Sequence, residues 1–416
     1  MLSLRCLSRI EEFMKSLLRP ALLLPLLLSL LILIVVGYGC DQQLVDSVHP
    51  RLQGMLDGKY AAYKSANGLP ENAGVLVYVQ SPKGSWAAGA GLPAGADGNW
   101  HYRVASVSKT FTAASIMLLD QQGKLKIDDV LTATIPNTPV PYLPDSPNYA
   151  IPYKGQITIR QLLSHRAGIF DVFNNPVPAT SKYPYAGKPY NSYVYLDLNE
   201  PDHQFTLDEL AGVVSANNLY TGLPGTEYKY SDTGYTLLAK IIERVSGKSY
   251  DRFLADNFLA PMGLKQTSAP WSAYDTTLPS PFLPGYSSDG SGFFETIEDN
   301  MSSQIGPGNI ISTPSDVAKW IRTLLSGRGP LTGEQITRMT TAPAGNTTYA
   351  LGIDNSEAGK GHSGAHPGYV NLVAYNPEDD VAVVVVTPFI DYSKLVEHLA
   401  LLIDVGKEAR NIVNGG

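Results

Sequence analysis

Tyr102-Arg-Val-Ala-Ser-Val-Ser-Lys-Thr-Phe-Thr112 is the most informative part of the sequence, because it places the Ser106 hydroxyl and the Lys109 amine three residues apart. Side chains at this spacing meet on one face of a helix. The apolar pattern that follows predicts a helix ending near Gly123, with Ser106 in its first turn, where unpaired N–H groups and the helix dipole favour negative charge. A serine nucleophile needs a base, which Lys109 supplies if burial favours its neutral form. Taken alone, the pattern is more typical of an N-cap serine and a solvated lysine.

Two later patches change this interpretation. The first is Pro224-Gly-Thr-Glu-Tyr-Lys-Tyr-Ser-Asp-Thr-Gly-Tyr235, in which Tyr230-Ser-Asp232 precedes a predicted helix at Leu237–Val245. The second is Gly361-His-Ser-Gly-Ala-His-Pro-Gly-Tyr369, directly ahead of the strand-like Val370–Tyr375.

In order and approximate spacing, these patches resemble the three motifs of the serine β-lactamase and penicillin-binding DD-peptidase superfamily: S-x-x-K, Y-x-N, and a K-T-G or H-x-G strand. The resemblance runs from about Val75 to Thr387, and its nearest branch is the group of class C β-lactamases, D-stereospecific peptidases and family VIII esterases. Other matching phrases are Ile157–Ile169, Gly247–Tyr250 and Gly308–Trp320. The resemblance implies an α/β fold, with an antiparallel sheet flanked by helices and an inserted, mostly helical lobe.

The resemblance also implies roles. Ser106 attacks an acyl carbonyl, Lys109 and Tyr230 move the proton to the leaving group, and the backbone N–H groups of Ser106 and Ala365 stabilise the oxyanion. The remaining substrate-binding candidates that the resemblance supplies are Asp232, His362, Ser363 and Gly364.

Each candidate has a plainer alternative. Tyr230 could be a core tyrosine, and His362 could be a strand histidine hydrogen-bonded to a backbone carbonyl. His366 is equally compatible with a loop residue, and His165 is expected to cap the carbonyls of the helix that it ends.

Asp232 departs from the usual asparagine of the second motif. An amide can donate to a substrate carbonyl, whereas a carboxylate can only accept. Asp232 beside Lys109 would favour the ammonium and shift base work toward Tyr230, unless its carboxylate simply caps the following helix. This departure tilts the prediction from penicillins toward esters or peptides.

The predicted function is a serine hydrolase that acts through an acyl-enzyme on cell-wall-type D-amino-acid peptides or small esters. The alternatives are a class C-type β-lactamase and a penicillin-recognising sensor or binding protein. No arginine lies between Arg338 and Arg410, so no clamp for a terminal carboxylate is evident near the third motif. The sequence contains neither H-E-x-x-H nor G-x-S-x-G, which disfavours a metallohydrolase and an α/β-hydrolase. We therefore expect no metal and no cofactor.

Strand-like segments occur at both ends of the chain, which predicts that the two ends share one sheet. They are Gly74–Gln80, Ser85–Ala88, Val370–Tyr375 and Val381–Val386. A final helix at about 392–410 has an apolar stripe that would cover this sheet. Helix starts are expected at Thr206, Thr313 and Thr332. We expect a sheet lobe at about 44–103 and 305–416, and a helical lobe at about 104–304.

Two stretches rich in proline, tyrosine and asparagine, at about 135–156 and 170–204, lack helical periodicity. They either wall the cleft or pack their tyrosines onto the helical lobe, and we favour packing.

Residues 1–39 read as a signal peptide or anchor, with an apolar stretch from Ala21 to Val36, and residues 40–416 as the hydrolase domain. Cys40 follows a small residue, as at a lipoprotein cleavage site, although Gly37 departs from the usual leucine. The alternative is a stray thiol at a signal-anchor boundary. We expect a membrane-tethered protein that faces the periplasm or cell envelope.

The 416 residues carry a formal net charge of −7 and show no basic stripe, which argues against nucleic-acid binding. The expected partners are a peptidoglycan-like peptide, an ester or a β-lactam, together with the membrane through the N-terminal lipid or anchor.

Overall fold

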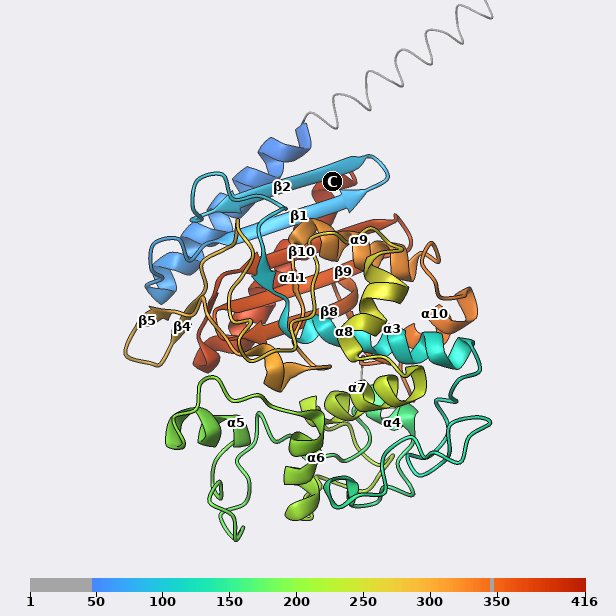
Figure 1. The fold of residues 1–416 in the computed structure, drawn as a ribbon. Coiled ribbons are helices and arrows are strands. Elements are labelled where there is room, and N and C mark those ends of the chain that lie inside the picture. The colour runs from blue at the N-terminus through green and yellow to red at the C-terminus, as the bar shows by residue number, and fades with distance from the viewer. Residues whose placement is uncertain (1–46, 345–347) are drawn as a thin grey trace, which may run out of the picture.

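A six-stranded antiparallel sheet forms the centre of the computed structural model, which describes residues 47–344 and 348–416 (Figure 1). Its strand order is β2-β1-β10-β9-β8-β7. The strands are β1 (Val75–Ser81), β2 (Gly84–Ala90), β7 (Asp354–Ser356), β8 (Gly359–His366), β9 (Tyr369–Asn376) and β10 (Val381–Thr387). Strand β1 pairs with β10 and so joins the two ends of the described chain, with Val77 opposite Val385. The predicted fold class and the shared sheet are therefore confirmed.

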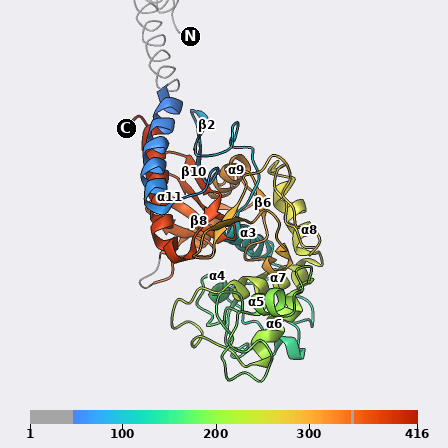
Figure 2. The same ribbon diagram turned by 90° about the vertical axis from the view of Figure 1, so that its left-hand side faces the viewer.

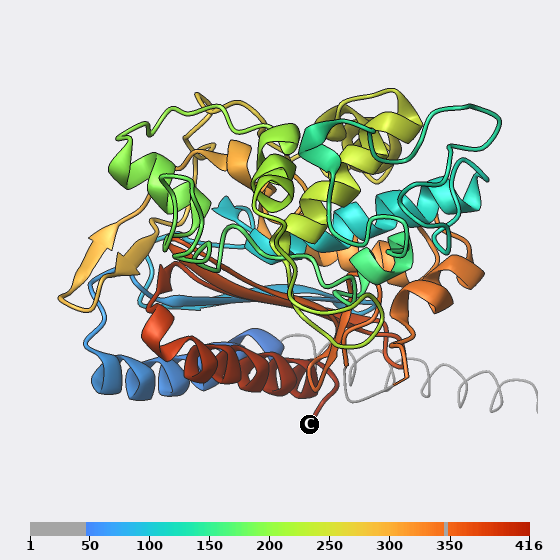
Figure 3. The ribbon, with the colours of Figure 1, turned by 90° about the horizontal axis from the view of Figure 1, so that it is seen from below.

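Helices cover both faces of this sheet (Figure 3). On one face, α11 (Leu395–Val413) and the helical residues 47–67 bury apolar side chains such as Leu52 and Leu402 against alternate strand positions. The opposite face packs on a larger core that includes α3 (Ser108–Gln121), α7 (Asp232–Ser246) and α9 (Pro314–Leu325). Helix α3, which follows the serine of the first motif, thus runs through the interior between sheet and helices.

A stacked aromatic pair fixes α3 within that interior. The rings of Phe111 and Trp320 are parallel, with centroids 3.8 Å apart, and the Trp320 indole N–H donates to Thr110 Oγ1 at 2.8 Å. The apolar face of the indole is therefore packed against a ring, and its N–H has a hydrogen-bond acceptor. The start of α3 is held rigidly as a result.

The remaining elements complete the fold around this centre. Helices α4, α5 and α6 gather away from the sheet (Figure 2). The further helices are α4 (Ile159–Leu163), α5 (Tyr190–Ser192), α6 (Leu207–Ala216), α8 (Tyr250–Leu254) and α10 (Gly333–Thr340). The further strands are β3 (Tyr102–Arg103), β4 (Tyr286–Ser288), β5 (Phe293–Glu295), β6 (Ile311–Ser312) and β11 (Phe389–Ile390).

The expected helix starts are confirmed. Thr206 forms a full capping box with Glu209, and Thr313 and Thr332 each accept a backbone N–H in the first turn of α9 and α10. The division into a sheet lobe and a helical lobe at the stated boundaries stays a prediction.

The signal segment 1–39 and Cys40 lie outside the described residues. Within 47–344 and 348–416, no helix combines the length and the apolar character needed to span a bilayer.

Candidate active site

The serine of the first motif lies in a tight turn. Ala105, just before it, has a φ of 51°, in the left-handed region that residues other than glycine rarely occupy. Ser106 then falls in a short 3-10 turn, η1 (Ala105–Val107), and α3 begins only at Ser108. The prediction that Ser106 lies in the first α-helical turn is wrong by this one turn, because the left-handed Ala105 delays the helix.

Lys109 points at this serine from the first turn of α3 and is fully buried. Its Nζ donates to Ser106 Oγ at 2.9 Å and to the Pro307 carbonyl at 3.0 Å, and it lies 2.6 Å from Asp232 Oδ1. Burial lowers the pKa of Lys109, while the carboxylates of Asp232 and Asp171 oppose that shift. Because burial is the larger effect, the neutral amine is more accessible than in water.

Tyr230 completes the group around the serine. Its hydroxyl donates to Ser106 Oγ at 2.9 Å, so two donors converge on one oxygen. Burial first, and the Asp232 carboxylate second, raise the pKa of Tyr230 well above its usual value. The phenol is therefore neutral and able to donate, and the structure brings Ser106, Lys109 and Tyr230 together, as the motif resemblance implies.

His165 packs against this tyrosine. The two ring centroids are 4.1 Å apart, and His165 Nδ1 accepts the backbone N–H of Ser231 at 3.1 Å. Burial, followed by the charge of Lys109, lowers the pKa of His165 well below its usual value, so the ring is neutral. The expectation that His165 caps helix carbonyls is wrong, because its side chain accepts a hydrogen bond from the second motif.

Asp232 is the first residue of α7, and Ser231 is the N-cap that accepts the Gly234 N–H. The alternative reading of Asp232 as a helix cap is therefore wrong. Its carboxylate instead faces Lys109 through Oδ1 and accepts from Asn174 Nδ2 through Oδ2, at 2.9 Å.

Behind Asp232 lies a second, buried carboxylate, Asp171. It accepts the Asp232 backbone N–H at 3.1 Å and the Asn174 side-chain amide at 2.8 Å. Burial and the neighbouring Asp232 charge raise the pKa of Asp171 to about 6.

Strand β8 passes close to the nucleophile at Gly364. A Cβ at this position would lie 2.5 Å from the Val104 carbonyl oxygen and 3.0 Å from the Ala105 Cβ. Asn371 on β9 reinforces the approach by donating to the same Val104 carbonyl at 3.2 Å. Glycine is thus required for the strand to approach the serine, and Ala365 is the next residue along it. The oxyanion role of Ala365 stays a prediction.

His362, earlier on β8, matches its plainer alternative. Its Nδ1–H donates to the Ser363 carbonyl, and its Nε2 accepts from the Tyr349 hydroxyl at 2.9 Å. Burial, together with the nearby Lys109 charge, lowers the pKa of His362 to about 4, so the ring is neutral at physiological pH. Both ring nitrogens are used within the protein, and roles for His362 and Ser363 in substrate binding stay predictions.

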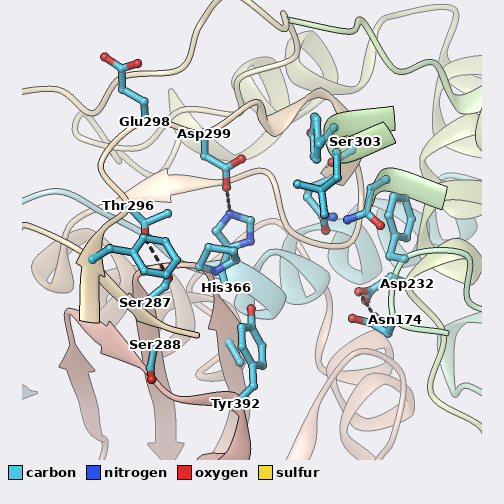
Figure 4. A pocket seen from close by; sticks show the side chains of 18 residues that line it. Asn174, Asp232, Ser287, Ser288, Thr296, Glu298, Asp299, Ser303, His366 and Tyr392 are labelled. Carbon is cyan, nitrogen blue, oxygen red and sulfur yellow. Dashed lines mark hydrogen bonds and ion pairs between the residues drawn. The ribbon is translucent and has the colours of Figure 1, made fainter. Parts of the chain in front are cut away.

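A cavity of about 750 Å³ opens beside these groups, between the second motif and the end of β8 (Figure 4). Asp232 and Asn174 line one side, and Ala365 and His366 line another. The residues that line it are Phe173, Asn174, Asn191, Tyr195, Leu196, Asp232, Ser287, Ser288, Phe294, Thr296, Glu298, Asp299, Ser303, Gln304, Ala365, His366, Pro367 and Tyr392.

His366 is the last residue of β8 and not a loop residue, and its Nε2 pairs with the Asp299 carboxylate. Burial opposes ionisation of Asp299, but His366 and Arg103 together lower the pKa of its carboxyl below the usual range. This wall of the cavity therefore presents an ionised carboxylate held by a histidine.

The tyrosine-rich stretch at 170–204 does both things that its sequence allows. Tyr183 and Tyr185 stack on each other with centroids 5.3 Å apart, while Phe173, Asn174 and Tyr195 line the cavity. The favoured interpretation, packing alone, was incomplete.

Several residues of the site were not predicted from the sequence, namely Asp171, Asn174, Asp299, Pro307 and Tyr349. They lie in loops without a motif, so only their spatial proximity identifies them. The polar pair Asp171 and Asn174, just after the matched phrase ending at Ile169, was the one available signal. Among the residues that the structure describes, no cluster of three or more histidine, cysteine, aspartate or glutamate side chains could hold a metal ion.

Comparison with known proteins agrees with this geometry. A family model described as Beta-lactamase matches residues 67–388. Protein flp of Staphylococcus aureus (strain NCTC 8325 / PS 47) is 26% identical over 310 residues, covering 72% of this chain and 55% of that protein. The chain thus spans little more than half the length of this curated relative.

Two solved structures have the same fold. One is a D-stereospecific amidohydrolase from Streptomyces sp., with a TM-score of 0.67 and 24% identity over 84% of this chain and 97% of that one. The other is the D-amino acid amidase of Ochrobactrum anthropi SV3, complexed with L-phenylalanine amide, with the same TM-score and identity over 87% and 98%. Because the family model covers most of the chain, and its motif residues Ser106, Lys109 and Tyr230 meet in one site, the chain belongs to the Beta-lactamase family within the serine β-lactamase and penicillin-binding protein superfamily.

Proposed function

We propose that this protein is a serine hydrolase that cleaves amide or ester bonds through an acyl-enzyme on Ser106. The observation that carries the proposal is the convergence of Lys109 Nζ and Tyr230 OH on Ser106 Oγ, each at 2.9 Å. A serine with no catalytic role needs neither a buried lysine nor a buried phenol on its oxygen.

In the first half-reaction, neutral Lys109 accepts the Ser106 hydroxyl proton while the Oγ–C bond forms. Tyr230 donates its proton to the leaving nitrogen or oxygen as the C–N or C–O bond breaks, and Lys109 then returns a proton to Tyr230. The net result is the transfer of one proton from the serine hydroxyl to the leaving group. Water cleaves the Oγ–C bond in the second half-reaction by the reverse proton transfers, releasing the acid and restoring the serine.

The oxyanion forms where Ser106 and the end of β8 approach each other. We assign its stabilisation to the backbone N–H groups of Ser106 and Ala365, because Gly364 brings the strand against the turn that carries the serine.

Asp232 shapes this chemistry by its charge. With a carboxylate 2.6 Å from Lys109, the ammonium is favoured relative to a site that has asparagine there, so the base is weaker at low pH. We propose D-amino-acid peptides, amides or small esters as substrates rather than penicillins, whose acyl amide carbonyl needs a donor that Asp232 does not offer.

We also propose that the protein is lipidated at Cys40 and faces the periplasm or cell envelope, because Gly39-Cys40-Asp41 follows an apolar stretch.

The test of the hydrolase proposal is turnover of p-nitrophenyl esters, a cephalosporin and D-Ala-D-Ala peptides by wild type and Ser106→Ala. We expect turnover of an ester or peptide, and a loss of about 10³-fold or more in the variant, as for other nucleophiles. Equal rates in both proteins would overturn the proposal.

A further inference from the structure

The second motif lacks the asparagine that would donate a hydrogen bond to a substrate, yet an asparagine stands beside it. Asn174 comes from the loop after α4 and lies next to Asp232 at the cavity wall (Figure 4). Its side-chain Nδ2 donates to Asp232 Oδ2 at 2.9 Å and to Asp171 Oδ2 at 2.8 Å.

These contacts decide which way the amide faces. The Nδ2 group has two hydrogens, and both are used by carboxylates. The flipped amide would place its oxygen against two carboxylate oxygens, which is repulsive. The backbone N–H of Asn174 also donates to Asp171 Oδ1, at 3.3 Å, and holds the loop in place. Asn174 therefore offers the cavity only its carbonyl oxygen, which has no protein partner within the described residues.

The other charged residues that line the cavity, like the Asn174 carbonyl oxygen, favour a positively charged group. None of the described residues that line the cavity is a lysine or an arginine. Three of them are acidic, namely Asp232, Glu298 and Asp299. Lys109 balances Asp232, and His366 holds Asp299. Glu298 is exposed and makes no ion pair within the described chain, so the cavity has a surplus of negative charge.

The cavity is placed to receive the acyl half of a substrate. A leaving group must take its proton at Tyr230, and neither Tyr230 nor Lys109 lines the cavity. Ala365 and Asp232 do line it, and we therefore assign the cavity to the acyl half of the substrate.

From these observations we propose that Asn174 is a specificity-determining residue whose side-chain carbonyl accepts from a primary ammonium on the acyl half of the substrate. The preferred substrates are then amides or esters of amino acids with a free amine, and acylation of that amine removes the interaction. The inference rests on the proposed acyl-enzyme function and adds the chemical class of the acyl group.

The test compares D-phenylalanine amide, N-acetyl-D-phenylalanine amide and 3-phenylpropanamide as substrates of wild type and Asn174→Leu. We expect wild type to prefer the free amine by about 10-fold or more in kcat/KM, as for one hydrogen bond to a charged group. Asn174→Leu should lose this preference, mainly through a higher KM for the free amine. Asn148→Leu, which changes an exposed asparagine outside the cavity, is the matched control and should keep the preference.

A second readout separates recognition from support of Asp232. The rate at which a fluorophosphonate labels Ser106 is the reference, and in Asn174→Leu the kcat/KM for the free amine should fall by about 10-fold or more beyond any fall in this labelling rate. A parallel fall in labelling for every reagent would show that Asn174 only positions the proton relay, and would overturn the inference. So would a wild type that labels at Ser106 but does not distinguish the free amine from its acetylated or deaminated analogues. A wild type that does not label at Ser106 would instead defeat the proposed hydrolase function itself.

Discussion

Replacing Asp232 by asparagine should move the activity of this protein toward lower pH, because the carboxylate faces the base that activates Ser106. Asp232 Oδ1 lies 2.6 Å from Lys109 Nζ, and the lysine is fully buried. At an effective dielectric constant of about 20, two unit charges at this distance attract each other by about 6 kcal/mol. Desolvation of both groups offsets part of that attraction, and breaking a buried pair typically costs about 3–5 kcal/mol.

The sign of the pH effect follows from the remaining environment. Burial already lowers the pKa of Lys109, and Asp232 is the main group that opposes it. The asparagine variant leaves burial opposed only by Asp171, whose own pKa is raised to about 6 and should fall once its charged neighbour is gone. His362 and His165 are both neutral and add no charge that would hold the proton on Lys109. Lys109 in the variant therefore loses its proton at lower pH.

Three measurements test this effect. The acidic limb of kcat/KM for an ester should shift to lower pH in Asp232→Asn, and turnover of a cephalosporin should improve relative to the ester. Asp232→Asn should lower the free energy of unfolding in urea most near about pH 6 and less near about pH 9. The folded pKa of Lys109 is lowered in the variant, so the unfolded state binds more protons and the stability of the variant rises with pH.

Asp404→Asn is the control, since it breaks an exposed ion pair with Lys59 and should cost about 1 kcal/mol or less, with no change in the activity profile. Superimposable activity profiles of wild type and Asp232→Asn, with a stability difference that is the same at both pH values, would show that Asp232 does not hold the proton on Lys109.

Three further predictions concern the support of the site and its location. Asp171→Asn should flatten the pH dependence of the unfolding free energy between about pH 4 and about pH 6. The pKa of this carboxyl is raised above 3.8 in the folded protein, so wild type loses stability as pH rises through this window. Urea midpoints of the variant that depend on pH as in wild type would contradict this. Gly364→Ala should lower the unfolding free energy by about 1–3 kcal/mol and reduce kcat, because its Cβ would lie 2.5 Å from the Val104 oxygen. The control is Gly333→Ala, which has open space around it and should be active. Equal activity of the two variants would argue against the close approach of β8. Cys40→Ser should move the protein from the membrane to the soluble fraction of cells, and identical membrane fractions with an unprocessed N-terminus would indicate a signal anchor instead.

Much of the fold could be predicted because its signals are local. The continuous apolar run at Val381–Val386 and the capping box at Thr206 depend on neighbouring residues, and both lie where the pattern indicates. The serine, lysine and tyrosine were predicted for a different reason, since each stands in a short motif with fixed spacing.

The rest of the site depends on contacts between distant segments. Nothing in the sequence around Asn174 indicates that it bridges Asp171 and Asp232, which requires the loop after α4 to fold onto the start of α7. The error at His165 has a similar origin, because its left-handed backbone, with a φ of 55°, turns the ring toward the second motif and away from the helix it follows.

The most direct test of the central claim is mass spectrometry of the protein quenched during reaction with a fluorophosphonate or a slowly hydrolysed ester, followed by peptide mapping. We expect one covalent adduct on Ser106, formed in wild type and absent from Ser106→Ala. An adduct on any other residue, or one that persists in Ser106→Ala, would contradict the central claim.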